Sequence, residues 1–157
     1  LFPGNSVRLR YGYIVTCTGF DKDPATGEVV AVRCTYDPET RGGNAPDNRK
    51  VKGTIHWVSA AHAVPMEARL FDHLFVAERP MDVPDGVDWV TTVNPGSLEV
   101  LSGYAEPRLA SAEPGRSFQF ERLGYFCCDP DTRPGAPVFN RSVSLRDTWA
   151  KIEKKQA

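Results

Sequence analysis

Two arginines near the start of the chain stand two residues apart in a run that is otherwise typical of a β-strand. They are Arg8 and Arg10 in VRLRYGYIVTC. Successive side chains of a strand point to opposite faces, so both arginines are expected on one face and Tyr11 on the other. Paired guanidinium groups could bind a flat or anionic ligand, or could be hydrated on the exposed face of an edge strand. The residues alone leave both interpretations open.

A second basic group, Arg49, Lys50 and Lys52, lies in the run RKVKG. It could contact phosphates or could only keep a hairpin soluble, and neither reading is favoured by the residues themselves. The formal net charge of the 157-residue chain is −1, so a nucleic-acid partner would have to be met by such a local patch and not by the field of the whole molecule.

Residue patterns for catalysis or metal binding are missing from the sequence. None of the phosphate-binding or nucleophile-elbow patterns GxGxxG, GxxxxGK[ST] or GxSxG occurs. The four cysteines and three histidines lack the paired spacing that zinc sites use. We therefore predict a binding module with no catalytic residue, no bound cofactor and no metal site of its own.

The elements that must position these residues are predicted to be β-strands. Apolar residues alternate with polar ones at a period of two, and 13 glycines and 13 prolines separate the runs. The predicted fold class is therefore all-β, either barrel or sandwich. The strand-like runs cover residues 7–18, 28–36, 51–59, 66–71, 98–104, 117–122, 125–128 and 137–145. Residues 64–75 could instead form a short helix after Pro65.

The location of the protein is constrained by composition. No stretch approaches the roughly 20 apolar residues of a membrane span, and the first residues lack the layout of a signal peptide. The cysteines fit a reducing compartment, so we expect a cytoplasmic protein without a membrane partner. The first residue is Leu1 and not methionine, so we expect the chain to be part of a longer polypeptide.

Two long stretches, with the runs VRLRYGYIV and VRCTYDPET, carry a resemblance to a known family. The stretches are RKVKGTIHWVSAAHAVPMEARLFDHLF, residues 49–75, and GRSFQFERLGYFCCDPDTRPGAPVFNRSVSLRDTWAK, residues 115–151. The sequence resembles the C-terminal anticodon-binding region of bacterial glutaminyl-tRNA synthetases, which are class I aminoacyl-tRNA synthetases. The resemblance covers residues 7–151.

The resemblance implies two ribosomal-protein-like β-barrels, a distal barrel inserted into a partly represented proximal barrel. It divides the chain into a distal anticodon-binding barrel at 7–97, returning strands of the proximal barrel at 98–150, and a tail at 151–157. The nucleotide-binding signatures HIGH and KMSKS of the family have no counterpart in this sequence. The chain is therefore expected to bind RNA without catalysing a reaction.

The resemblance also implies RNA-binding roles for named residues. It places Arg8 and Arg10 near the first anticodon nucleotide, and Gln119 and Arg122 of the QFER run near the central uridine. The third nucleotide would be read by residues upstream of Leu1. Strand alternation puts Gln119 and Arg122 on opposite faces, so both can meet one ligand only if a bulge or turn intervenes before Gly124. Lys50 and Lys52 are candidates for phosphate contacts.

The implied partners are the anticodon loop of a glutamine tRNA and the catalytic domain of the same polypeptide, in a monomer. That domain would use ATP and magnesium to charge the tRNA with glutamine. Two alternatives stay open: the anticodon-binding barrel of a related glutamyl-tRNA synthetase, against which the QFER run weighs, and a free-standing RNA-binding or protein-interaction barrel. The aromatic residues Trp57, Phe118, Phe120, Tyr125 and Phe126 are expected in the core and not as stacking platforms.

Overall fold

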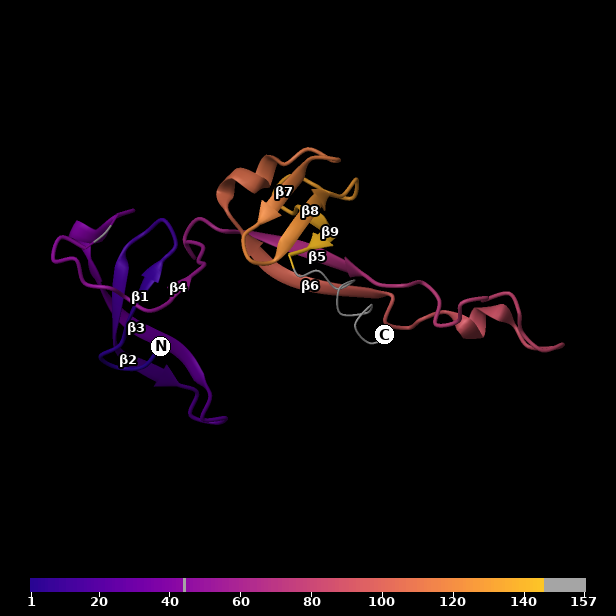
Figure 1. Cartoon of the computed structure of the whole chain (residues 1–157), viewed down its shortest axis with the longest axis horizontal. Helices are drawn as coiled ribbons and strands as arrows, with labels where there is room; N and C mark the ends of the chain where they lie inside the picture. The colour runs from indigo at the N-terminus through magenta and orange to yellow at the C-terminus, as the bar shows by residue number, and fades with distance from the viewer. Residues whose placement is uncertain (44, 146–157) are drawn as a thin grey trace, which may run out of the picture. The chain divides into compact units, whose positions relative to one another are not determined.

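The structure, a computed structural model, describes residues 1–43 and 45–145. The chain divides into two compact units, Leu1–Trp57 and Val58–Ala157. Figure 1 shows that the regular elements of both units are strands joined by turns and short 3-10 helices, which confirms the all-β prediction. The predicted tail at 151–157 and the end of the predicted 98–150 segment lie outside the described residues.

The first unit is a four-stranded sheet with the order β3-β2-β1-β4. Its strands are β1 (Ser6–Leu9), β2 (Ile14–Lys22), β3 (Val29–Asp37) and the two-residue β4 (Thr54–Ile55). β1 and β3 run antiparallel to β2, whereas β4 runs parallel to β1. A 3-10 helix, η1 (Pro38–Thr40), follows β3.

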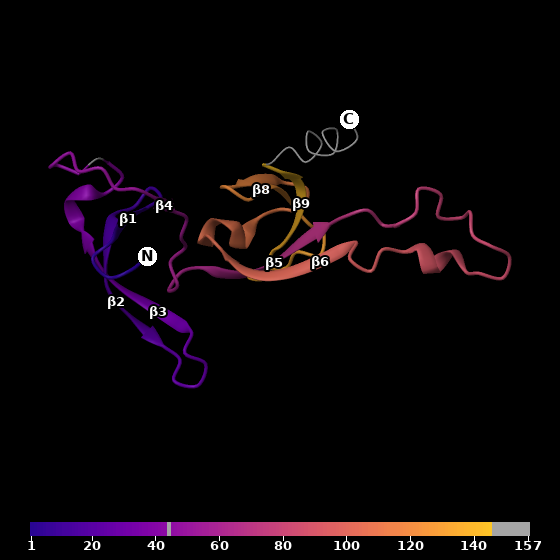
Figure 2. The same ribbon diagram turned by 60° about the horizontal axis from the view of Figure 1, so that its bottom comes forward.

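The second unit is a five-stranded sheet with the order β6-β5-β9-β8-β7. Its strands are β5 (Val64–Phe71), β6 (Leu98–Ala105), β7 (Ser117–Phe120), β8 (Gly124–Cys128) and β9 (Val138–Ser144). The 3-10 helices η2 (Trp89–Thr92) and η3 (Pro107–Ser111) lie in its connections. Figure 2 shows the segment between β5 and β6 extending beyond the end of this strand pair. In both units the sheet has two distinct edge strands, so the barrel-like sheets are not closed.

Each unit has its own small hydrophobic core. In the first unit Val7, Ile14, Val15, Cys17 and Ala45 are buried. In the second, Phe126, Cys128 and Phe139 are buried and are packed against partly buried residues that include Phe118 and Phe120. The alternation of β7 and β8 explains this core, because every second side chain of these strands points to the same face.

Two local expectations differ from the structure. The predicted run 7–18 is interrupted, since β1 ends at Leu9 and β2 begins at Ile14. The helical alternative for residues 64–75 is wrong, because Val64–Phe71 pairs along its whole length with Leu98–Ala105. The two compact units meet after Trp57, and within the second unit Leu98–Ala105 pairs with Val64–Phe71. The division into a distal barrel at 7–97 and returning strands at 98–150 stays a prediction.

Candidate functional site

The two N-terminal arginines are placed by a tight turn that follows β1. The backbone N–H of Gly12 donates to the carbonyl of Leu9 at 2.9 Å, which closes the turn. The N–H of Arg10 donates to the carbonyl of Ile55 at 2.9 Å. Its carbonyl accepts a hydrogen bond from Nε1 of Trp57, also at 2.9 Å. The backbone of Arg10 is therefore fixed at both its polar groups.

Tyr11 occupies an unusual backbone conformation at the tip of this turn. Its φ is +56°, a region that side-chain-bearing residues rarely adopt and that bulky ones adopt least readily. The residue is 80% exposed. The guanidinium carbon of Arg10 lies 4.8 Å from the centre of the Tyr11 ring, and Nη2 of Arg10 donates to the Tyr11 hydroxyl at 3.3 Å. Strand alternation puts Arg10 and Tyr11 on opposite faces and so does not predict this contact. The two residues can meet because they lie in the turn between β1 and β2, where the alternation of a strand does not hold.

Arg8 is anchored to the core of the same unit. Its Nη1 donates to the carbonyl of Thr40 at 3.2 Å. Thr40 is completely buried, and its hydroxyl donates to the carbonyl of Asp37 at 2.7 Å and accepts from the backbone N–H of Ile14 at 2.9 Å. The guanidinium group of Arg8 is thus held by a residue that cannot easily move.

The two arginines meet at a shallow depression of about 330 Å³ in the first unit. Its lining consists of Arg8, Arg10, Tyr11, Gly42, Gly43 and Thr54. Thr54 belongs here because β4 pairs with β1 in a register that sets it opposite Arg8. The depression combines positive charge, an aromatic ring and two glycines whose backbone is unshielded by side chains. Such a surface suits an anionic ligand with a flat group.

The members of the second basic group, Arg49, Lys50 and Lys52, differ in their ion pairing. Arg49 bonds to the carboxylates of Asp37 and Asp47, and its hydrogen bond to Asp37 is the main cause that raises the pKa of its guanidinium. Lys50 and Lys52 are exposed. Among residues 1–43 and 45–145 no ion pair is formed by these two lysines. Of the three basic residues, the two lysines are therefore better suited than Arg49 to meet an external anion.

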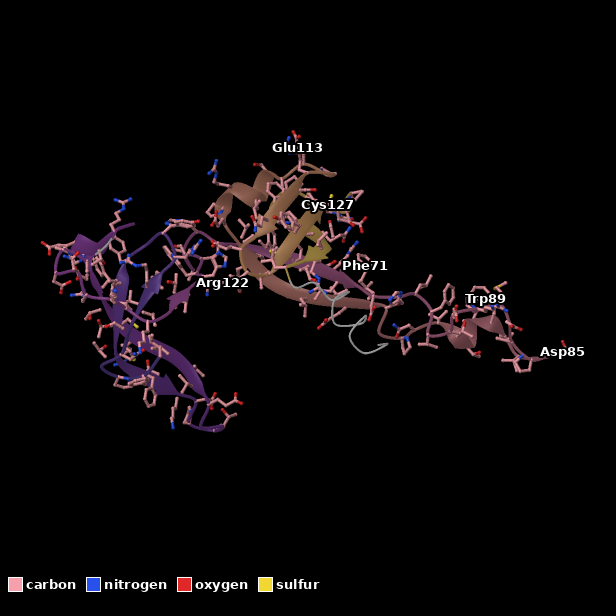
Figure 3. The ribbon with its side chains drawn as sticks, viewed as in Figure 1. Phe71, Asp85, Trp89, Glu113, Arg122 and Cys127 are labelled. Atoms are coloured by element: carbon pink, nitrogen blue, oxygen red, sulfur yellow. The ribbon has the colours of Figure 1, made fainter. Side chains whose placement is uncertain are left out.

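Gln119 and Arg122 lie on the hairpin formed by β7 and β8. Gln119 is exposed on β7. Arg122, labelled in Figure 3, is exposed in the turn after β7. The N–H of Leu123 donates to the carbonyl of Phe120 at 2.9 Å, and the φ of Arg122 is +65°. The turn that strand alternation required before Gly124 is present.

Gly124 is required for the close approach of this turn to β9. Its φ is +147°, and a Cβ atom there would collide with the carbonyl oxygen of Val143. Both the backbone angle and the contact therefore exclude larger residues. Gly124 is therefore the residue at which the turn that contains Arg122 ends and β8 begins.

Gln119 stands in an exposed row that crosses three strands. It pairs with Tyr125, which pairs in turn with Val143. Tyr125 is 44% exposed, contrary to the expectation that it belongs to the core, and so is Trp57 at 42%. Phe126 is buried as expected. The period of two could have indicated the position of Tyr125, because it alternates with Phe126.

A cluster of charges on the second unit has a structural role. Arg69 donates to Glu67 and to Asp131, both at 2.7 Å, and its Nη1 lies 3.4 Å from Asp129. Asp129 is buried and accepts a hydrogen bond from the backbone N–H of Asp131 at 2.8 Å. This bond, helped by the side chain of Asn140 and the charge of Arg69, lowers the pKa of Asp129 below its usual value. The cluster joins β5 to the loop after β8.

Metal-binding clusters and membrane-spanning helices do not occur in the described part of the chain. Within 1–43 and 45–145, no three side chains of the histidine, cysteine, aspartate or glutamate type are grouped so that they could hold a metal ion. In the same residues no helix has the length and apolar character needed to cross a membrane.

Comparison with known proteins gives two concordant findings. Residues 54–129 match the family described as tRNA synthetases class I (E and Q), anti-codon binding domain. The chain is 58% identical over 152 residues, 97% of its length, to the glutamine–tRNA ligase of Nitrobacter hamburgensis, and covers 26% of that protein. It is 53% identical over 153 residues to the ligase of Cupriavidus necator, with 96% and 26% covered. With the ligase of Vibrio parahaemolyticus it shares 51% over 156 residues, with 99% and 27% covered. The chain thus spans about a quarter of the length of these curated relatives.

Proposed function

The chain belongs to the family of anticodon-binding domains of class I tRNA synthetases, and we propose that it binds the anticodon loop of a glutamine tRNA on behalf of a glutamine–tRNA ligase. The observation that carries the proposal is the identity of more than half of the residues to such ligases across nearly the whole chain. The exposed basic and amide side chains described above supply suitable chemistry, because unpaired loop bases present their edges and faces to proteins.

Arg8 and Arg10 are proposed to contact the first anticodon nucleotide. Support comes from the depression that both residues line and from the anchoring of Arg8 on the buried Thr40. A guanidinium group held in place loses less conformational freedom on binding than a flexible one. Fixed arginines can therefore select a base edge and phosphate by geometry as well as by charge.

Gln119 and Arg122 are proposed to recognise the central uridine. The amide of Gln119 can both donate to and accept from a uracil edge, and the guanidinium of Arg122 can donate to it or to the adjoining phosphate. Both side chains are exposed, and a turn separates them in place of a continuous strand. Lys50 and Lys52 would hold phosphates without reading sequence.

In this proposal the chemical steps take place outside the chain. A catalytic domain of the same polypeptide, carrying the HIGH and KMSKS signatures that this sequence lacks, would bind ATP, magnesium and glutamine. It would form glutaminyl adenylate and esterify the tRNA end. The residues of this chain would act on that reaction only by selecting the tRNA, as a monomer in the cytoplasm.

The proposal is tested by aminoacylation with the intact protein. Transcripts of a glutamine tRNA and of the same tRNA with a changed central anticodon base are compared, and we expect efficient charging of the first only. Binding of the isolated anticodon stem-loop should weaken as salt rises, with a slope that reports the phosphates neutralised. Equal charging of both transcripts, or stem-loop binding without a salt slope, would refute anticodon recognition.

A second candidate function is tested by the same assay, because the matched family includes domains of both the E and the Q enzymes. In this alternative the protein would be a glutamyl-tRNA synthetase. Its distinguishing result is charging of a glutamate tRNA with glutamate and no charging of the glutamine tRNA with glutamine.

A further inference from the structure

Tyr11 has a backbone conformation that its side chain makes costly. It is the third residue of the turn Leu9–Gly12, where a positive φ favours glycine or asparagine. A tyrosine there is not explained by local stability. An observed backbone outlier of this kind is a reason to look for a function of the side chain.

Packing does not explain the tyrosine either. It is 80% exposed, more than any other large hydrophobic residue in the described part of the chain. Burial of its ring therefore contributes little to folding. The ring of Tyr11 lies against the guanidinium group of Arg10, and both residues line the same depression as Arg8. Cation–π contact occupies one face of the ring and leaves the remainder exposed to solvent.

We propose that Tyr11 is a stacking residue that receives the face of an unpaired nucleobase beside Arg8 and Arg10. The inference rests on the proposed function and deepens it, because it adds a base-stacking surface to a site so far described by its charges. Aromatic rings stack on bases in single-stranded segments with little dependence on base identity. Tyr11 would thus hold the first anticodon base in place, while the arginines supply the contacts to its edge and phosphate.

The geometry favours a base over a purely anionic ligand. A phosphate or carboxylate would bind to the two guanidinium groups alone, because the electron-rich face of a tyrosine does not attract an anion. A flat heterocycle with an attached phosphate uses both features of the depression at once. The hydroxyl of Tyr11, which accepts from Arg10, further restricts how the ring can rotate.

The test is a double-mutant cycle between Tyr11 and the first anticodon base, with binding of the anticodon stem-loop to the intact protein as the readout. The two loops used are the native one and one with an abasic site at the first anticodon position. Tyr11→Leu is expected to weaken binding of the native loop by about fivefold to a hundredfold. It is expected to leave binding of the abasic loop unchanged, because the base that it stacks on is absent.

Three further variants control the cycle. Tyr11→Phe keeps the ring and should bind the native loop within about threefold of wild type, since stacking needs only the ring. Tyr11→Asn should bind as weakly as Tyr11→Leu while its thermal unfolding midpoint is equal to or above that of wild type, because asparagine tolerates a positive φ. Tyr36→Leu replaces an exposed tyrosine of β3, 64% exposed, and should bind like wild type.

The outcomes separate the two proposals. If Tyr11→Leu weakens both loops equally, or neither, the stacking role is wrong. If Arg10→Gln nevertheless weakens binding, the proposed function survives without it. If the wild-type protein does not bind the native stem-loop at all, the proposed function fails and the stacking role fails with it.

Discussion

The two turns that carry the candidate RNA-binding residues are built in the same way on unrelated sheets. Each follows a strand and is closed by a 2.9 Å backbone hydrogen bond, from Gly12 to Leu9 in the first unit and from Leu123 to Phe120 in the second. In each, the third residue has a positive φ although it is not glycine: Tyr11 at +56° and Arg122 at +65°. Both turns therefore have a strained backbone at a residue whose large side chain is exposed.

The difference between the turns is in what supports them. The first turn is fixed by polar contacts, from Trp57 to the carbonyl of Arg10 and from Arg8 to the buried Thr40. The second rests on aromatic packing, since the rings of Phe120 and Phe126 are stacked with their centres 4.4 Å apart. A turn held by hydrogen bonds should be sensitive to the removal of single partners, and one held by packing to cavities beneath it.

The largest effect is expected from removing the aromatic support of the second turn. Phe139 is fully buried, and its ring centre lies 5.1 Å from that of Phe120. Phe139→Ala should lower the free energy of unfolding of the second unit by about 3–5 kcal/mol through the cavity that it leaves. The measurement is denaturant unfolding combined with amide hydrogen exchange, which follows both turns separately.

The control for this variant is Val143→Ala, because Val143 is 57% exposed. It should change stability by no more than about 0.5 kcal/mol. Equal reduction of hydrogen-exchange protection in the first turn and the second on Phe139→Ala would show that the supports of the two turns are not independent.

A smaller effect is expected from the charge cluster of the second unit. The pKa of Asp129 is lowered in the folded state, so its ionised form stabilises the fold above the ordinary aspartate pKa of about 3.9. This contribution disappears as the pH falls through the lower folded-state pKa. Asp129→Asn should therefore cost about 1.5–3 kcal/mol near neutral pH and progressively less below about pH 4.

The measurement for Asp129 is the unfolding free energy of wild type and variant as a function of pH. Asp131→Asn is the matched control, because Asp131 is exposed and its charge contributes less. A stability difference between wild type and Asp129→Asn that persists unchanged to the most acidic conditions would contradict the assignment.

The next largest effect is expected on base recognition by the residues at the second turn. Gln119→Ala and Arg122→Gly should each weaken discrimination at the central anticodon position by about 1–3 kcal/mol, the usual value of a base-edge contact. Glycine is chosen at position 122 because it relieves the positive φ, so the fold is preserved. The measurement is kcat/KM for aminoacylation of tRNA with the native central uridine and with that base replaced.

Equal reductions on both tRNAs would mean that the QFER run has a structural role and does not read a base. Tyr125→Phe serves as a control in the same exposed row, because it preserves the ring that pairs across from Gln119. It should leave the ratio of the two kcat/KM values unchanged.

The smallest effect is expected from the lysines. Lys50→Ala or Lys52→Ala should reduce affinity for all anticodon sequences alike, and removal of each phosphate-binding charge should reduce the salt slope by about 0.7 for a single-stranded segment. Arg49→Ala is the comparison, since its ion pairs with Asp37 and Asp47 predict a weaker effect on the slope. If either lysine variant changes the preference for an anticodon base, the assignment of that lysine to a phosphate contact is wrong.

Much of this protein follows from the sequence by itself. The period of two and the many glycines and prolines predict the all-β class correctly, because strand alternation is local and turns are encoded by a few residues. The strands Leu98–Ala105 and Gly124–Cys128 begin and end within about a residue of the predicted runs. The family is apparent from the long matching stretches, and Gly124 is the point before which a turn has to occur.

Tertiary structure alone decided the surroundings of the candidate residues. Strand periodicity places Tyr11 on the face opposite the arginines, because the period of two is extended through Gly12, although a glycine inside a strand-like run can mark a break. The pairing of β1 with β4, which comes much later in the chain, brings Thr54 opposite Arg8, and the backbone of Arg10 is fixed by Ile55 and by the side chain of Trp57. Contacts between residues so distant in sequence depend on how the whole sheet packs, and no local pattern specifies them.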